Sequence, residues 1–142
     1  MDKSGLRGAP LLFWMVVLLA VGIIFIGVRF LAAPITAAAA FGVPAGAAPQ
    51  IAYLWAKGTR DIVSGLLLLG LLGMRVRSRV IAVFILVAVL IPVSDFVNVY
   101  LNMGYVSALA LHAGTAAFMV ILAALLWRTG AGQTRDSNVA AA

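Results

Sequence analysis

The 142-residue chain contains no cysteine and no glutamate, and it has only one histidine. The lack of cysteine excludes disulfides, thiolate metal sites and cysteine nucleophiles. Charged residues amount to 10% of the chain, whereas soluble domains contain about 25%. The chain also has no His-x-Glu-x-x-His pattern, no glycine-rich phosphate loop and no Gly-x-Ser-x-Gly elbow. We therefore expect neither a soluble domain nor a bound cofactor.

Hydrophobic residues make up 65% of the chain and gather in long apolar runs. A helix needs about 20 apolar residues to cross a bilayer, and four runs have roughly this length: residues 9–28, 56–74, 80–99 and 106–127. Backbone groups in lipid must be bonded within their own segment, so these runs should be helices. The sequence therefore predicts an all-α integral membrane four-helix bundle, with one transmembrane domain over residues 1–128 and a disordered tail over residues 129–142.

The net charge of +6 is explained by the ends of the apolar runs. No stretch interleaves basic residues with exposed aromatic residues, so we expect no nucleic-acid partner. Cytoplasmic flanks of membrane helices are rich in Lys and Arg. Seven basic residues fall on one side of a chain that crosses four times: Lys3, Arg7, Arg75, Arg77, Arg79, Arg128 and Arg135. We expect a multi-pass protein of the inner (plasma) membrane with both termini in the cytoplasm.

The long connection between the first two runs, residues 30–55, has no charge and is rich in Ala, Gly and Pro. Pro34, Pro44 and Pro49 make one continuous helix unfavourable there. The segment is too apolar for a solvated loop, so we expect it at the outer interface. It is either a simple connector or a lid over an opening between the helices.

The remaining ionisable residues outside the tails share one depth in the membrane. Measured from the flanking arginines at about 1.5 Å per residue, Asp61 lies roughly 21 Å deep, and Asp95 and His112 lie roughly 24 Å deep. Lys57 and Arg60 open the second run beside Asp61, and Arg29 lies somewhat higher on the first. Ionised groups facing lipid cost roughly 2.5 kcal/mol or more. We therefore expect the six residues to face inward as one polar cluster toward the outer leaflet.

The cluster provides candidate catalytic and binding residues. The short side chains of Asp61, Asp95 and His112 cannot reach the headgroups, and they are the catalytic candidates. The ligand-binding candidates are Arg29, Lys57, Arg60, Ser64, Asn98 and Thr115. Other readings stay open, because Arg29 and Lys57 can extend to the headgroups, Asn98 and Thr115 can bond across helices, and a paired network can simply fix the helix register.

Two further patterns concern helix geometry. Pro92 frees a backbone carbonyl one turn before Asp95, and it can kink the third helix and widen the bundle at that level. Gly65, Gly70 and Gly73 are predicted to permit close helix packing. One His and two Asp on three helices make a weak metal site beside three cations, so no metal is expected.

Two carboxylates and an imidazole in a semi-dry pocket can perform acid/base chemistry. Asp61 has two basic neighbours in sequence and is expected as base or anchor; Asp95 follows an apolar run and is expected as proton donor, with His112 as shuttle. The ligand would be a small lipophilic molecule, and the net positive cluster suits an anionic one. An isomerase, cyclase or hydrolase fits, but so does a proton-coupled transporter, a binding protein or an accessory membrane subunit. A homodimer is also compatible with the glycine-rich faces.

The stretches Arg29-Phe30, YLWAKGTRDIVSG and IPVSDFVNV, followed by His112, resemble an uncharacterised family of small four-helix membrane proteins. This family is distantly similar to DoxX-like proteins. The resemblance covers about residues 20 to 127, and Lys-Gly-x-Arg-Asp is its most specific part. It implies a four-helix membrane bundle and gives no catalytic assignment. The positions that the resemblance marks are Arg29, Lys57, Gly58, Arg60, Asp61, Asp95 and His112.

Overall fold

The protein is all-α in the part of the chain that the computed structural model describes, namely residue 6 and residues 9–44, 48–104 and 106–139 (backbone alone for 48–49 and 131–139). Six helices cover these residues, which contain no strand: α1 Pro10–Ala32, α2 Pro34–Phe41, α3 Ala48–Gly73, α4 Ser78–Ala88, α5 Leu90–Met103 and α6 Ala108–Val139. The predicted fold class is thereby confirmed as all-α. Lys3, Arg7 and the side chain of Arg135 lie outside the described part.

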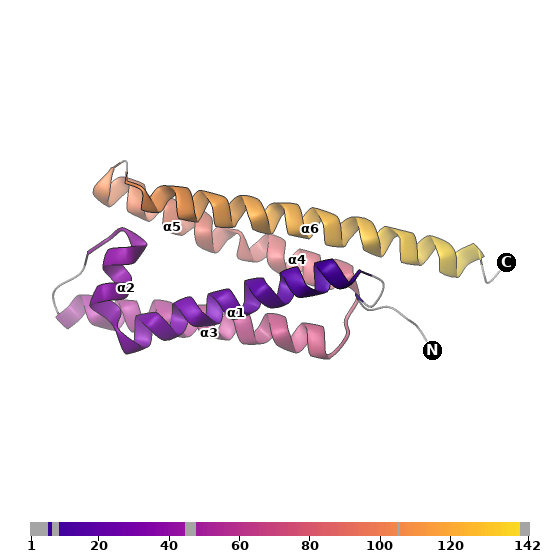
Figure 1. The fold of residues 1–142 in the computed structure, drawn as a ribbon, viewed down its shortest axis with the longest axis horizontal. Helices are drawn as coiled ribbons and strands as arrows, with labels where there is room; N and C mark the ends of the chain where they lie inside the picture. The colour runs from indigo at the N-terminus through magenta and orange to yellow at the C-terminus, as the bar shows by residue number, and fades with distance from the viewer. Residues whose placement is uncertain (1–5, 7–8, 45–47, 105, 140–142) are drawn as a thin grey trace.

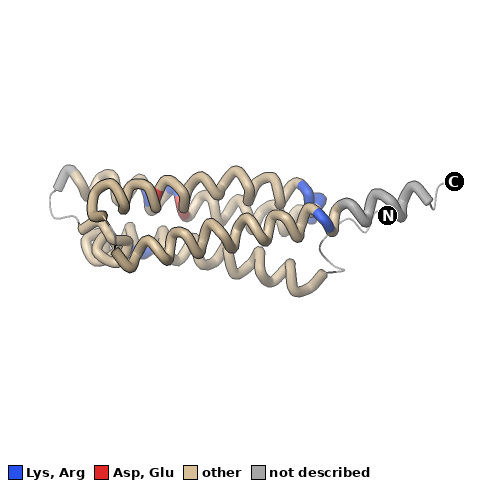
Figure 2. Tube along the Cα trace, turned by 90° about the horizontal axis from the view of Figure 1, so that it is seen from above, with Lys and Arg blue, Asp and Glu red and all other residues tan. Residues whose placement is uncertain are grey.

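The helices form two long antiparallel pairs with a short helix between them at one end. Figure 1 shows α1 lying beside α3, while α4 and α5 follow one another along the side of α6. The short α2 turns across the space between the pairs, at the end away from the start of α1. Figure 2 shows Lys and Arg gathered at the opposite end, and a second group of charges about the α2 end. We call these the basic end and the α2 end.

Three segments are long and apolar enough to cross a membrane: Pro10–Ala32, Ser78–Met103 and Ala108–Gly130. Large apolar side chains point outward along them, as lipid requires, with Leu11 73% and Leu90 68% exposed. α3 has 26 residues, but every membrane-length stretch of it includes Lys57, Arg60 and Asp61. The composition therefore identifies a membrane protein with three such segments.

The connection predicted over residues 30–55 is mostly helical. α1 continues to Ala32, α2 occupies Pro34–Phe41, and α3 begins at Ala48, so the segment is not one continuous helix, as predicted, but a series of helical pieces. The reason is the position of the prolines. Pro34 stands in the first turn of α2 and Pro49 in the first turn of α3, where the missing N–H breaks no helical hydrogen bond. Gly42 ends α2 in a left-handed conformation, with φ 104°.

Pro92 acts on the third predicted helix one turn earlier than expected. The helix is divided at Val89 into α4 and α5, because a proline clashes with the carbonyl four residues before it, here that of Ala88. α6 continues through Val139, into the segment for which a disordered tail is expected. The helix-favouring Ala and Gln and the absence of proline after Trp127 allow this extension. In the link before α4, Arg75 adopts a positive φ of 55°.

A dry core fills the half of the molecule toward the basic end. It joins α1, α3, α4 and α6, and its fully enclosed side chains are Val16, Leu68, Ile81, Ile85, Leu122 and Leu126. Close contact between α1 and α3 depends on glycine. A Cβ added to Gly27 would lie 2.5 Å from the carbonyl oxygen of Gly58, and one added to Gly65 would lie 2.7 Å from that of Ala20.

The prediction for Gly65 is therefore confirmed. For Gly70 and Gly73 the packing prediction is wrong, because an added Cβ meets nothing within 4 Å at either position.

We predict that Gly27→Ala lowers the free energy of unfolding by about 1–3 kcal/mol, since two backbones would have to separate. Gly70→Ala is the matched control, because it adds the same methyl group to a helix where there is room. Thermal unfolding of both variants in detergent measures the difference. Equal melting temperatures would contradict the close α1–α3 contact.

Candidate functional site

A cavity of about 170 Å³ lies between the helices toward the α2 end, and all six helices contribute to its walls. The walls are largely apolar, with Ile23, Phe30, Ala37, Ile91 and Met119 among them. This volume is close to that of an engineered cavity that binds benzene, about 150 Å³, and below the roughly 300 Å³ of drug-sized pockets. We call it the interhelical cavity; it suits a small molecule or one end of a longer one.

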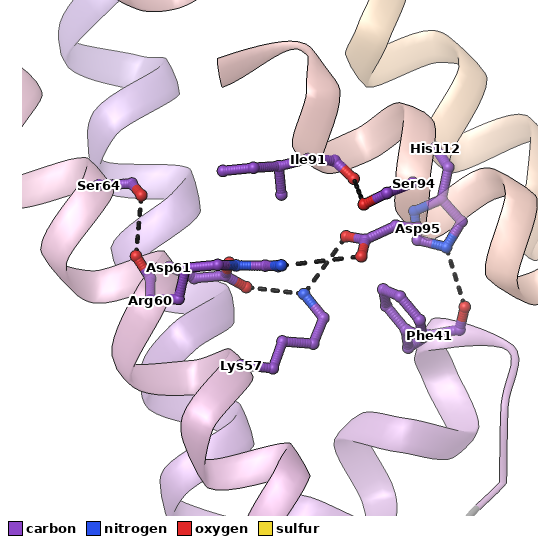
Figure 3. A network of polar contacts seen from close by, with 9 residues as sticks. All are labelled: Phe41, Lys57, Arg60, Asp61, Ser64, Ile91, Ser94, Asp95 and His112. Atoms are coloured by element: carbon purple, nitrogen blue, oxygen red, sulfur yellow. Dashed lines mark hydrogen bonds and ion pairs between the residues drawn. The ribbon is translucent and has the colours of Figure 1, made fainter. Parts of the chain in front are cut away.

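Four charged side chains form a closed network at this cavity. The Nζ of Lys57 donates to Oδ2 of Asp61 at 2.8 Å and to Oδ2 of Asp95 at 3.4 Å. The guanidinium of Arg60 donates to Oδ1 of Asp61 through Nε at 3.1 Å and Nη2 at 2.9 Å. Its Nη2 also lies 3.8 Å from Oδ1 of Asp95. Figure 3 shows the two cations of α3 reaching across to the carboxylate on α5.

Two aromatic rings enclose the ammonium group of Lys57. Its Nζ lies 4.8 Å from the ring centre of Phe30 and 4.7 Å from that of Phe41, which makes two cation–π contacts. The side chain is only 15% exposed. Between two carboxylates and two rings, the ammonium group of Lys57 holds the network together at the cavity wall.

His112 joins α6 to the end of α2. The buried imidazole places Nε2 3.0 Å from the carbonyl oxygen of Phe41, and its ring stands edge-on to that of Phe41. A carbonyl oxygen can only accept, so Nε2 carries the proton of this hydrogen bond. In neutral His112 the lone pair is then on Nδ1, which has no hydrogen-bond partner among the described residues. The arrangement leaves a basic nitrogen available at the wall of the cavity.

Arg29 is the one cation of the predicted cluster that the network does not include. It is in the last turn of α1, it lines the cavity and its side chain is exposed. Within the described part of the chain it forms no ion pair. Since Lys57 and Arg60 balance Asp61 and Asp95, Arg29 supplies the net positive charge of the site.

The structure brings most of the predicted site residues to this cavity, but not all of them. Its lining includes Arg29, Lys57, Asp61, Ser64, Asp95, His112 and Thr115. Arg60 reaches the carboxylates from outside the lining, and its side chain is 41% exposed. Asn98 does not reach the cavity; its side-chain oxygen accepts a hydrogen bond from Asn102, one turn along.

Ser64 and Thr115 donate to backbone carbonyls of their own helices, those of Arg60 and Leu111. No hydrogen bond of either hydroxyl crosses to another helix among the described residues.

The expected difference between the two carboxylates is not present. The sequence places Asp95 after an apolar run and predicts a proton donor in apolar surroundings. The expected apolar surroundings are wrong, because the fold lays Asp95 against the same two cations as Asp61; its role as proton donor stays a prediction. Asp61 is the more tightly held, with three contacts at 3.1 Å or less and 5% exposure. Its oxygens are occupied, so it fits the role of anchor better than that of base.

Phe30 and Phe41 belong to the site, although the sequence did not predict either of them. Phe30 is adjacent to the expected Arg29, which is a weak signal. For Phe41 no signal exists, because its ring and carbonyl take part only through the placement of α2. Among the described residues, no group of three His, Cys, Asp or Glu side chains could hold a metal ion.

Comparisons with known proteins give one family match. A family model described as Domain of unknown function (DUF4267) matches residues 20–126, which include every charged residue of the site. No curated protein and no solved structure matches the chain. A link to DoxX-like proteins remains a prediction.

We predict that Asp61→Asn lowers the free energy of unfolding by about 3 kcal/mol or more, since it leaves two cations at a site with one remaining carboxylate. The double variant Lys57→Met, Asp61→Leu removes one charge of each sign and should cost less than the single change. Thermal unfolding in detergent compares them. If Asp61→Asn were as stable as the wild type, the network would make no contribution to the free energy of unfolding.

Proposed function

Since the chain belongs to the family of unknown function DUF4267, we propose its function from the site: it is a four-span membrane protein that binds a small lipophilic molecule in the interhelical cavity and transfers protons on it. The observation that carries the proposal is the combination of apolar walls with an unoccupied imidazole nitrogen and an unpaired cation at one cavity. Few polar groups converging in an apolar pocket are typical of ligand sites.

α3 is proposed as the fourth span. Its charges are the reason that composition alone does not select it. The fold turns Lys57 and Asp61 inward, and it pairs the more exposed Arg60 with Asp61. Asp61 is 4% exposed and Lys57 is paired with two carboxylates and covered by two rings. Neutralised and inward-facing charges remove most of the cost of burial in hydrocarbon. With four spans, the positive-inside rule favours both chain termini and the basic end in the cytoplasm, with the cavity toward the outer leaflet.

The proposed chemistry uses His112 as the base. Nδ1 takes a proton from an acidic C–H or O–H of the bound molecule, and the ring becomes an imidazolium. The same nitrogen returns that proton to another atom of the molecule, so a double bond or hydroxyl proton shifts and nothing is consumed. The hydrogen bond to the Phe41 carbonyl holds the ring in the tautomer that this step needs.

The dry core favours an enclosed binding site and disfavours a transport path through the molecule. Below the cavity, toward the basic end, Val16, Leu68, Ile85, Leu122 and Leu126 are all but inaccessible. These buried side chains are all apolar, so within the described part of the chain they offer no polar group along which a proton could continue. A molecule in the cavity therefore leaves by the side on which it arrived, as a substrate does.

We predict the four-span topology from cysteine labelling, for which the cysteine-free chain is suited. A membrane-impermeant maleimide added to intact cells should label Met103→Cys, at the end of α5, but not Met74→Cys, after α3. After permeabilisation both should react. Labelling of Met74→Cys without labelling of Met103→Cys would contradict this topology, because the protein would then be inverted or α3 would not cross. Labelling of both in intact cells would exclude a crossing by α4 and α5, which lie between the two sites.

We predict that His112→Gln keeps the bound molecule but stops proton transfer. The glutamine amide can donate to the Phe41 carbonyl in place of Nε2, but it has no basic nitrogen. Molecules of the host's total lipid extract that co-purify with the protein are incubated with it in D₂O. Mass spectrometry then follows the uptake of deuterium into these molecules. Exchange should fall by about 100-fold or more in His112→Gln.

The control for this experiment is Asn98→Ala, a change on α5 away from the cavity, which should exchange like the wild type. Unchanged exchange in His112→Gln would reject His112 as the base.

A further inference from the structure

A groove on the outside of the bundle, between α1 and α6, adjoins the interhelical cavity. It measures about 390 Å³, and on α6 it is lined by residues such as Gly114 and Phe118. The groove and the cavity share the wall residues Leu19, Ile23, Ile26, Leu111 and Thr115. Leu111 is 60% exposed and Ile26 43% exposed, so this shared wall also faces the surroundings of the helices. We call it the α1–α6 groove.

Two glycines create the groove. A Cβ added to Gly22 on α1 or to Gly114 on α6 meets nothing within 4 Å, although both residues line this space. By contrast, Gly27 of α1 and Gly65 of α3 lie in the contact between these two helices, where an added Cβ would clash with the opposite helix. The missing side chains therefore leave room that no helix of the fold uses. All lining residues except Thr115 are apolar, which suits hydrocarbon and not a polar partner.

The direction of the groove relates it to Arg29. Along α1 the groove runs from Ile26, at the shared wall, to Leu18, a length of roughly 12 Å along the helix axis. Arg29 stands less than one turn above Ile26 and lines the cavity, without an ion pair among the described residues. An unpaired guanidinium at the top of an apolar furrow matches an anionic head with a hydrocarbon tail. Carboxylate and phosphate both fit a guanidinium fork.

We infer that the ligand is a single-chain acidic amphiphile: its anionic head pairs with Arg29 at the interhelical cavity, and its hydrocarbon chain lies in the α1–α6 groove. The inference rests on the proposed function, which requires only that the cavity takes a small lipophilic molecule. It adds the charge of the head, the place of the tail and the route. The groove faces the bilayer, so the amphiphile reaches the cavity sideways from the membrane without crossing water.

The experiment uses the full-length protein in nanodiscs of phosphatidylcholine, with radiolabelled dodecanoate as the probe. Dodecanoate should bind saturably, and dodecylamine, with the same chain and the opposite charge, should compete roughly tenfold or more weakly. Arg29→Gln should weaken dodecanoate by a similar factor and leave competition by neutral dodecanol unchanged. Equal competition by the amine and the acid would overturn the assignment of the head.

The tail is tested by filling the groove. Gly22→Leu and Gly114→Leu place a side chain in open space and should weaken both dodecanoate and dodecanol roughly tenfold or more. Gly70→Leu is the matched control, because Gly70 also has open space around it and lines neither the groove nor the cavity. Equal binding by the groove variants and the control would overturn the inference.

Other occupants give distinct results. If phospholipid is the occupant, phosphatidylglycerol discs abolish dodecanoate binding and the lipid itself depends on Arg29, which overturns the single-chain ligand. If a second copy is the occupant, Gly22→Leu and Gly114→Leu change the oligomeric state and leave dodecanoate binding intact. Failure of the proposed function is separate: no probe, charged or neutral, would then bind the wild type.

Discussion

The requirement that charge within an apolar interior be neutralised organises this molecule. Lys57 and Arg60 on α3 and Asp95 on α5 meet around Asp61, and this network is the polar connection between the α1–α3 pair and the α5–α6 pair. A buried ion network of this kind is weak evidence for added stability, because desolvation offsets most of its attraction. Its effect is on register: α3 and α5 can slide past each other only by separating opposite charges.

The network also explains why the molecule has two unlike halves. Toward the basic end, apolar side chains from four helices pack into one buried core. Toward the α2 end, the charged groups keep the pairs apart, and α2 fills only part of the gap, with Phe41 contacting both Lys57 and His112. The cavity is thus a result of where the charges sit along the helices. The same four long segments therefore form the dry core toward the basic end and the interhelical cavity toward the α2 end.

The sequence is sufficient for the broad fold and for the gathering of the charges, because both follow from one-dimensional rules. Apolar run length sets helix length, and residue counts from the flanking arginines set depth, so Asp61, Asp95 and His112 could be placed at one level. Direction around the helix axis is less accessible: Asn98 lies three residues after Asp95, on a neighbouring part of the same helix face, yet it does not line the cavity. Least accessible are features that depend on the path of a short apolar segment. The placement of α2, the carbonyl of Phe41 and the cations beside Asp95 follow from tertiary contacts that no periodicity encodes.

The left-handed backbone of Arg75 has a consequence for how the chain keeps its orientation. Glycine would take this conformation without strain, whereas an L-residue with a side chain costs about 1 kcal/mol there. The link between α3 and α4 nevertheless holds an arginine, in line with Arg77 and Arg79. At this residue an unstrained turn requires glycine, whereas a positive charge in the link requires arginine or lysine. A glycine would relax the hairpin and remove one of the positive charges that, in the proposed topology, favour the cytoplasmic side for this link. In that topology, ease of local folding is given up for a defined direction of insertion.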